Sequence, residues 1–210
     1  MRRFLMVVSL VALTVNLIQG REKRALAQEE EEEAVYSGGI KVNLTEEEVQ
    51  EAINWGAENK DSFEVLIRPY VFGVLEAYEE SGYIGTKFYY LAFLGYLSAR
   101  KYKSPERAEV QTVLSAKVLP ISISTYGDKI DFAKDYHMVL KQGEKVIQPV
   151  KVKAPELAEM TARFPESPLF RATMSADFPY SEVDPKGKAT IILIKDWGES
   201  EFEVDFSRYK

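Results

Sequence analysis

The chain has 210 residues, with 33 acidic against 27 basic side chains, a single histidine and no cysteine. The acidic balance argues against a nucleic-acid-binding protein, because phosphate contacts need clustered lysine and arginine. The lack of cysteine excludes thiol catalysis and disulfide bonds, and a chain of about 180 residues beyond an export signal buries a sufficient core without them.

The N-terminal residues 1–27 have the layout of a secretory signal peptide. Two arginines precede an apolar run over residues 4–18, and Ala25-Leu26-Ala27 fits the small-x-small rule for cleavage before Gln28. The run is short for a membrane span of about 20 residues. The charged stretch 21–24 is unusual for a signal peptide, so an uncleaved N-terminal anchor stays open as the alternative. Either reading predicts export, and the absence of cysteine favours a bacterial protein that is periplasmic or secreted.

Residues 28–43 predict an acidic flexible linker. Glu29 to Glu33 is a block of like charge that cannot bury a core, and Ser37-Gly38-Gly39 has flexible composition. An acidic interaction tail is the alternative interpretation of this segment.

Residues 44–116 predict a helical portion. Thr45 followed by Glu48 is a capping-box signature for the first helix. A second helix start at Asp61 should end at Pro69, because proline lacks the backbone donor that a helix interior needs. The stretch 70–78 is ambiguous between helix and strand. A last helix is expected to begin at Ser104, with Pro105 in its first turn.

The most apolar segment beyond the N-terminal region runs from Phe88 to Leu97, with Thr86 placed to cap it. A helix that is apolar around its whole circumference must be buried or lie in lipid, and this run is too short to cross a bilayer. We therefore expect a central core helix. The alternative is a groove lined by tyrosines, which tolerate a wet edge: Tyr89, Tyr90, Tyr96 and Tyr102.

Residues 117–210 predict a β-rich portion, because the apolar period changes there from 3.6 to 2. Phe170 to Phe178 reads as a half-buried strand, and Lys188 to Phe206 as a closing hairpin. A further hairpin is expected around Gln142-Gly143. We predict an α+β fold: a helical portion packed with a six- to seven-stranded antiparallel β-sandwich of immunoglobulin-like architecture, with residues 44–210 as one folding unit.

Four lysines around the hairpin at Gln142-Gly143 share one parity and are expected on one face: Lys141, Lys145, Lys151 and Lys153. Lysines on an edge strand block edge-to-edge aggregation. The alternative is a surface that binds an anionic glycan or the acidic patch of a partner.

No catalytic residue, metal ligand or cofactor is predicted, and the binding residues stay unknown. His137 lies in a strand-like stretch without the glycine pattern of a nucleophile elbow, and a single histidine without cysteine does not make a typical zinc site. Several aspartates lie in turns without the spacing of an EF-hand: Asp128, Asp131, Asp135, Asp184 and Asp196.

These features predict a non-catalytic exported binding or assembly protein of the bacterial cell envelope, with an unknown ligand. Its partner would be a protein or another envelope component, not nucleic acid, and it would touch the membrane only through an uncleaved N-terminal segment. The alternative is an exported hydrolase with a carboxylate cluster at the helix–sandwich junction. A groove lined by acids and tyrosines would favour the hydrolase, whereas an exposed apolar patch or an unpaired strand edge would favour the binding protein.

Overall fold

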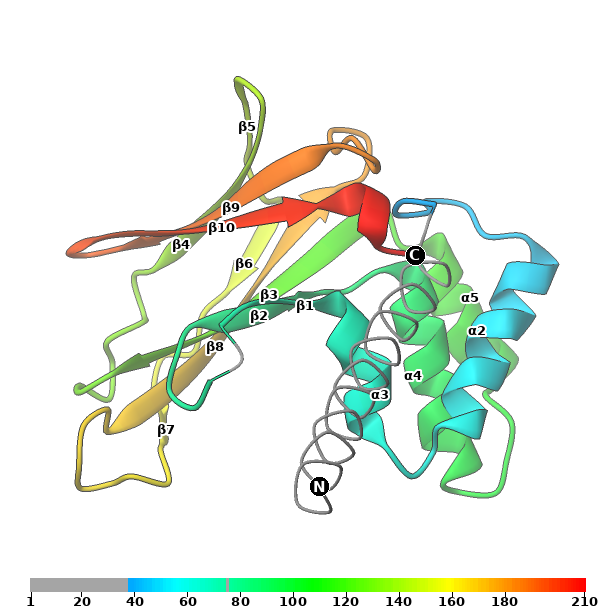
Figure 1. Ribbon diagram of the computed structural model, residues 1–210, viewed down its shortest axis with the longest axis horizontal. Coiled ribbons are helices and arrows are strands. Elements are labelled where there is room, and N and C mark those ends of the chain that lie inside the picture. Colours follow the sequence, from blue (N-terminus) through cyan, green and yellow to red (C-terminus); the bar gives the residue numbers. More distant parts are fainter. Residues whose placement is uncertain (1–37, 75) are drawn as a thin grey trace, which may run out of the picture. The chain divides into compact units, whose positions relative to one another are not determined.

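The computed structural model describes residues 38–74 and 76–210 (Figure 1). This part of the chain contains four α-helices and two antiparallel sheets, so the predicted α+β class is confirmed. The predicted signal peptide or anchor, residues 1–27, and the linker residues 28–37 lie outside the described residues. Within the described part, no helix is both long enough and apolar enough to cross a membrane.

The helices precede most of the strands in the chain. The α-helices are α2 (Glu46–Glu58), α3 (Phe63–Ile67), α4 (Lys87–Ala99) and α5 (Arg107–Ser115), and two 3-10 helices are η1 (Arg68–Tyr70) and η2 (Phe206–Arg208).

The first sheet has the strand order β1-β2-β3-β8-β6, and β7 also pairs with β8. Its strands are β1 (Val71–Gly73), β2 (Ser81–Ile84), β3 (Val118–Gly127), β6 (Lys151–Lys153), β7 (Glu159–Met160) and β8 (Phe170–Pro179). The second sheet has the order β10-β9-β4-β5. Its strands are β4 (His137–Gln142), β5 (Lys145–Ile147), β9 (Lys188–Lys195) and β10 (Gly198–Asp205).

Local capping fixes the starts of α2, α4 and α5. The capping box of Thr45 and Glu48 opens α2, and the Thr86 side chain accepts from the Tyr89 backbone N–H to open α4, both as predicted. The start predicted at Ser104 is wrong, because α5 begins at Arg107. There the Glu109 carboxylate reaches back to the backbone N–H of Glu106 at 2.9 Å.

The helix α4 is the central core helix that its apolar run predicts. Leu91 and Ala92 are fully buried, and Tyr89 and Tyr96 are also buried, Tyr89 within the hydrophobic cluster of the sheets. Tyr102 lies beyond the helix and is 95 % exposed, so the four tyrosines do not share one groove.

Helices α2 and α4 cross with their backbones in direct contact. A Cβ added to Gly56 would lie 1.8 Å from the Ala92 carbonyl oxygen, and one added to Gly95 would lie 2.1 Å from the Ile53 carbonyl oxygen. Only glycine has room at these two positions, and the crossing therefore depends on them.

The two sheets contribute to one hydrophobic cluster. From the first sheet it includes Ile121, Ile123 and Phe178, and from the second Leu140 and Ile191, all fully buried. The alternation predicted for Phe170 to Phe178 is confirmed from Ala172 onward, because every second residue from Ala172 to Phe178 is buried, while Phe170 is half-buried. The closing hairpin is also confirmed, since β9 pairs antiparallel with β10.

Residues 117–210 hold eight strands, β3 to β10, rather than the six or seven predicted. In addition, β1 and β2 come from the portion expected to be helical, and β2 pairs with β3. These short strands depend on pairing with a distant partner, which a local apolar period does not reveal. Pro120 lies in the interior strand β3, next to the last residue that pairs with β2.

The stretch Lys145 to Val152 does not form one strand. It divides at Pro149 into β5, in the second sheet, and β6, in the first. Lys141 and Lys145 therefore lie on a different sheet from Lys151 and Lys153, and the single shared face predicted for the four lysines is wrong. Both β5 and β6 are nevertheless outer strands, where lysines protect exposed edges.

Ordered structure begins earlier than the predicted start at Leu44. The backbone N–H of Ile40 donates to the Pro185 carbonyl at 2.9 Å, and that of Gly39 donates to the Ser207 carbonyl at 3.1 Å. Ile40 itself is buried in the cluster shared by the sheets. The end of the predicted linker is thus packed against the fold.

Candidate functional site

Four connecting segments meet at the end of the sheets that lies away from the helices, on the left in Figure 1. They are residues 74 and 76–80 before β2, 128–136 between β3 and β4, 154–169 around β7, and 195–199 at the β9–β10 turn. We call this surface the loop end.

The loop end carries an unusual share of exposed apolar side chains. Among the described residues, eleven large apolar side chains are exposed, and six of them lie here: Val74, Ile130, Leu157, Met160, Phe164 and Trp197. Trp197 is 75 % exposed and Met160 is 67 % exposed. Tryptophan, phenylalanine and methionine are enriched at protein interfaces, and exposed apolar groups of this kind mark interaction surfaces.

A buried ion pair holds the loop end together. The Glu80 carboxylate accepts hydrogen bonds from Lys195 Nζ at 2.8 and 2.9 Å, and from the hydroxyls of Thr125 and Ser200, each at 2.5 Å. The Lys195 side chain is only 4 % exposed, and that of Glu80 is 22 % exposed. Thr125 belongs to the first sheet, whereas Lys195 and Ser200 belong to the second. One carboxylate therefore ties the end of the segment before β2, at Glu80, to both sheets.

The electrostatics of this cluster favour the charged form of the Glu80 carboxylate. Burial of the Glu80 carboxylate acts to raise its pKa, but the hydrogen bonds from Lys195, Ser200 and Thr125 outweigh burial and hold the pKa below its ordinary value. The Lys195 ammonium also lies 4.4 Å from the centre of the Trp197 ring. This cation–π contact links the buried cluster to the most exposed side chain of the six.

Further contacts join the remaining segments. The Arg163 guanidinium lies over the Tyr78 ring at 5.2 Å. The Asp128 carboxylate accepts from the Ser167 hydroxyl at 3.0 Å and from the Leu169 backbone N–H at 3.1 Å. The exposed apolar side chains thus stand on loops that are held in place, which lowers the ordering cost of binding.

Four of the five turn aspartates have structural partners. Asp131 and Asp135 lie 3.7 and 4.0 Å from Lys134, and Asp184 accepts from the Lys186 backbone N–H at 3.0 Å. Over the part of the chain that the structure describes, no group of three or more histidine, cysteine, aspartate or glutamate side chains is placed to hold a metal ion.

His137 lies exposed at the start of β4. Its Nε2 atom is 3.4 Å from the Gln148 Oε1 atom. An amide partner of this kind does not activate a nucleophile, in contrast to the hydroxyl and carboxylate that flank a catalytic histidine.

A hydrolase groove at the junction of helices and sheet would be lined by tyrosines. Tyrosines do gather where α4 meets the first sheet, but their rings pack against one another. The ring centres of Tyr70 and Tyr89 are 5.0 Å apart. Burial raises the pKa of Tyr89, Tyr90 and Tyr180 far above the usual value, and it raises the pKa of Tyr209 to about 12. These phenols therefore stay neutral, as in a packed interior.

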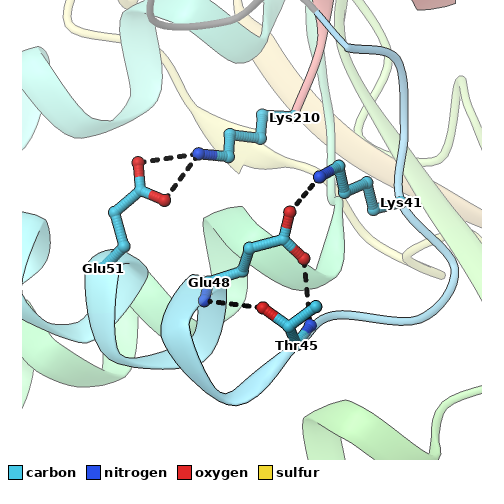
Figure 2. Close-up of polar contacts among 5 residues, drawn as sticks. All are labelled: Lys41, Thr45, Glu48, Glu51 and Lys210. Carbon is cyan, nitrogen blue, oxygen red and sulfur yellow. Dashed lines mark hydrogen bonds and ion pairs between the residues drawn. The ribbon is translucent and has the colours of Figure 1, made fainter.

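The carboxylates on α2 near this junction pair with lysines rather than with each other. Figure 2 shows Glu48 bound to Lys41 and to Thr45, and Glu51 bound through both oxygens to Lys210 at 2.7 Å. A glycoside hydrolase instead needs two carboxyl groups facing each other across the substrate.

The sequence did not single out the Glu80 cluster. The partners of Glu80 lie 45, 115 and 120 residues away along the chain, at Thr125, Lys195 and Ser200. No fixed spacing marks such a set. The nearest sequence signal is the turn composition of Asp196-Trp197-Gly198, which marks a hairpin but no cluster.

No protein-family model matches this chain, and no curated protein sequence matches it. The surface and the contacts described above therefore carry the functional argument.

Proposed function

We propose that this protein is an exported, non-catalytic binding or assembly protein of the bacterial cell envelope, and that the loop end is its binding surface. The observation that carries the proposal is the set of exposed apolar side chains on loops anchored by the Glu80–Lys195 pair. Such side chains weaken solubility unless they meet a partner, and fixed loops present them in one arrangement.

The arrangement of the strands supports the same proposal. We infer that the two sheets form an immunoglobulin-like sandwich, because they are antiparallel and contribute to one hydrophobic cluster. Sandwiches of this type cluster their connecting loops at the two ends, and variable immunoglobulin domains bind through the loops of one end.

Export is the part of the proposal that N-terminal sequencing tests. The two arginines and the apolar run over residues 4–18 predict that the periplasmic or secreted protein begins at Gln28. The full-length chain in washed membranes would favour the uncleaved anchor. The full-length chain in the cytoplasmic fraction would contradict export.

Site-specific cross-linking tests the binding surface. A photoreactive amino acid is placed at Trp197, Met160 or Phe164 in the producing cell, and in matched chains at Val65 or Tyr102, which are exposed on the helical side. We expect one defined covalent adduct from the three loop-end positions and none from the two controls. Adducts that form equally at all five positions, or at none, would contradict a binding role for the loop end.

A further inference from the structure

We infer that the outer edge of β10 (Gly198–Asp205) binds an extended segment of another protein, which joins the second sheet as a further strand and carries basic side chains at alternate positions. The inference rests on the proposed function and deepens it, because β10 begins in the loop end and the chemistry of the partner is now specified. Figure 1 shows β10 running from the loop end, on the left, toward the helices.

The strand β10 is the one long outer strand among the described residues. It has eight residues, whereas the other outer strands, β1, β5, β6 and β7, have two or three. All eight pair with β9 in one continuous register without a bulge. Short length, bulges, proline and lysine commonly protect a sheet edge from further pairing, and β10 has none of them.

The outer backbone groups of β10 are available for pairing. An edge strand turns a row of N–H and C=O groups away from its single neighbour. Within the described part of the chain, no group outside β9 makes a hydrogen bond with the backbone of Glu199 to Val204. The strand β1 lies close by, with the Phe72 and Phe202 ring centres 5.4 Å apart, but it does not pair with β10. A strand added at this edge would therefore meet free donors and acceptors.

Acidic side chains line one face of this edge. Glu199, Glu201 and Glu203 alternate along β10, so they project to the same face, and all three are exposed. None of the three forms an ion pair with a described residue. Their neighbours on β9 are two isoleucines and a threonine, which carry no neutralising charge. Lysine or arginine on an added strand would supply the missing charge, because side chains of opposite charge on adjacent strands attract.

The same carboxylates disfavour a second copy of this chain as the occupant. Antiparallel pairing of two β10 strands would bring their glutamates onto one face beside each other, and like charges on adjacent strands destabilise a sheet. A partner with basic residues at alternate positions has no such conflict.

The opposite face of β10 limits the size of the partner's remaining side chains. The Ser200 hydroxyl bonds to the Glu80 carboxylate, and the Phe202 ring lies against the Phe72 ring. Val204 is buried on the same face. Side chains that an added strand directs to this side would adjoin packed groups of the two sheets. The partner segment should therefore alternate basic residues with small apolar ones.

A synthetic peptide tests the inference on the full chain as purified from the producing cell. The probe is a labelled seven-residue peptide in which four lysines alternate with three alanines. One control places the four lysines in a block before the alanines, and a second carries N-methylated backbone nitrogens, which cannot donate to a sheet. Fluorescence anisotropy should show saturable binding of the alternating probe and at least about tenfold weaker binding of both controls, since a tenfold change corresponds to about 1.4 kcal/mol.

Charge reversal on the protein places the probe at β10. The variant Glu201→Lys with Glu203→Lys should bind the probe at least about tenfold more weakly. The matched control, Glu58→Lys with Glu144→Lys, makes the same change in net charge on other surfaces and should bind like the parent. All four side chains are exposed, so the melting midpoints should match that of the parent. Hydrogen exchange of the parent should slow over residues 199–204 when the probe is bound.

The absence of saturable binding by the alternating probe would overturn the inference. So would equal binding of the block or N-methylated peptide, binding that the β10 reversal leaves unchanged, or bound probe without slower exchange in β10. If the inference fails while loop-end cross-linking captures a protein, the proposed function stands with a partner held by the loops alone. If cross-linking captures nothing either, the proposed function fails as well.

Discussion

Replacement of Lys195 by methionine is expected to destabilise the fold by about 3 kcal/mol, because it leaves the Glu80 carboxylate without its cation. That carboxylate is largely removed from water and would keep only the two hydroxyl donors from Thr125 and Ser200. Urea unfolding at pH 7 measures the difference. As a control, Lys101→Met removes an exposed lysine and should change the free energy of unfolding by no more than about 0.5 kcal/mol.

The same pair gives stability a defined pH dependence. The pKa of Glu80 is lower in the folded than in the unfolded chain, so its contribution is present above the unfolded value of about 4.3. It is lost as the pH falls through the lowered folded pKa. Unfolding curves from pH 7 to 3 should lose part of their acid dependence in Glu80→Gln. If Lys195→Met matched the parent in stability, the pair would not hold the loop end as described.

The substitution Gly95→Val is expected to cost about 3 kcal/mol or more, because even a Cβ at this position would lie 2.1 Å from a backbone oxygen of α2. A backbone atom does not rotate away as a side chain does, so α2 and α4 must separate. Gly56→Ala, on the other helix of the crossing, should have a similar effect, since its Cβ would lie 1.8 Å from the Ala92 carbonyl oxygen.

The matched control for the glycine pair is Gly38→Ala. The nearest atom to a Cβ at that position is Lys41 Cε, at 4.0 Å, which is ordinary contact. Thermal and urea unfolding of the three variants should separate Gly38→Ala, near the parent, from the two crossing variants. Parent-like stability of Gly95→Val would show that the helices do not pack with backbones in contact.

Features that depend on neighbouring residues were predictable from the sequence. Thr45 and Thr86 cap helices because their hydroxyls accept from backbone groups three residues later. The buried alternation of β8 follows from the two-residue period of a strand. In each case the physical cause lies within a few residues of its effect.

Features that depend on distant pairing were not predictable. The strand β2 has only four residues and exists because β3 lies beside it. The split between β5 and β6 follows from which sheet each strand joins, although both look like one strand around Pro149. The loop end is not predictable for the same reason: each of its turns has a local signal, but their meeting depends on the whole fold.

The Glu80 cluster also imposes an order in time. Residues 74–80 leave the ribosome early, whereas Lys195 and Ser200 belong to β9 and β10, which are made after every other described strand. Until then the carboxylate has Thr125 as its only partner in the cluster. A chain that stops before residue 195 therefore lacks the cation that fixes this loop, and a nascent or clipped chain does not display the finished surface. The loop end can therefore reach its final arrangement only after the β9–β10 hairpin has been synthesised.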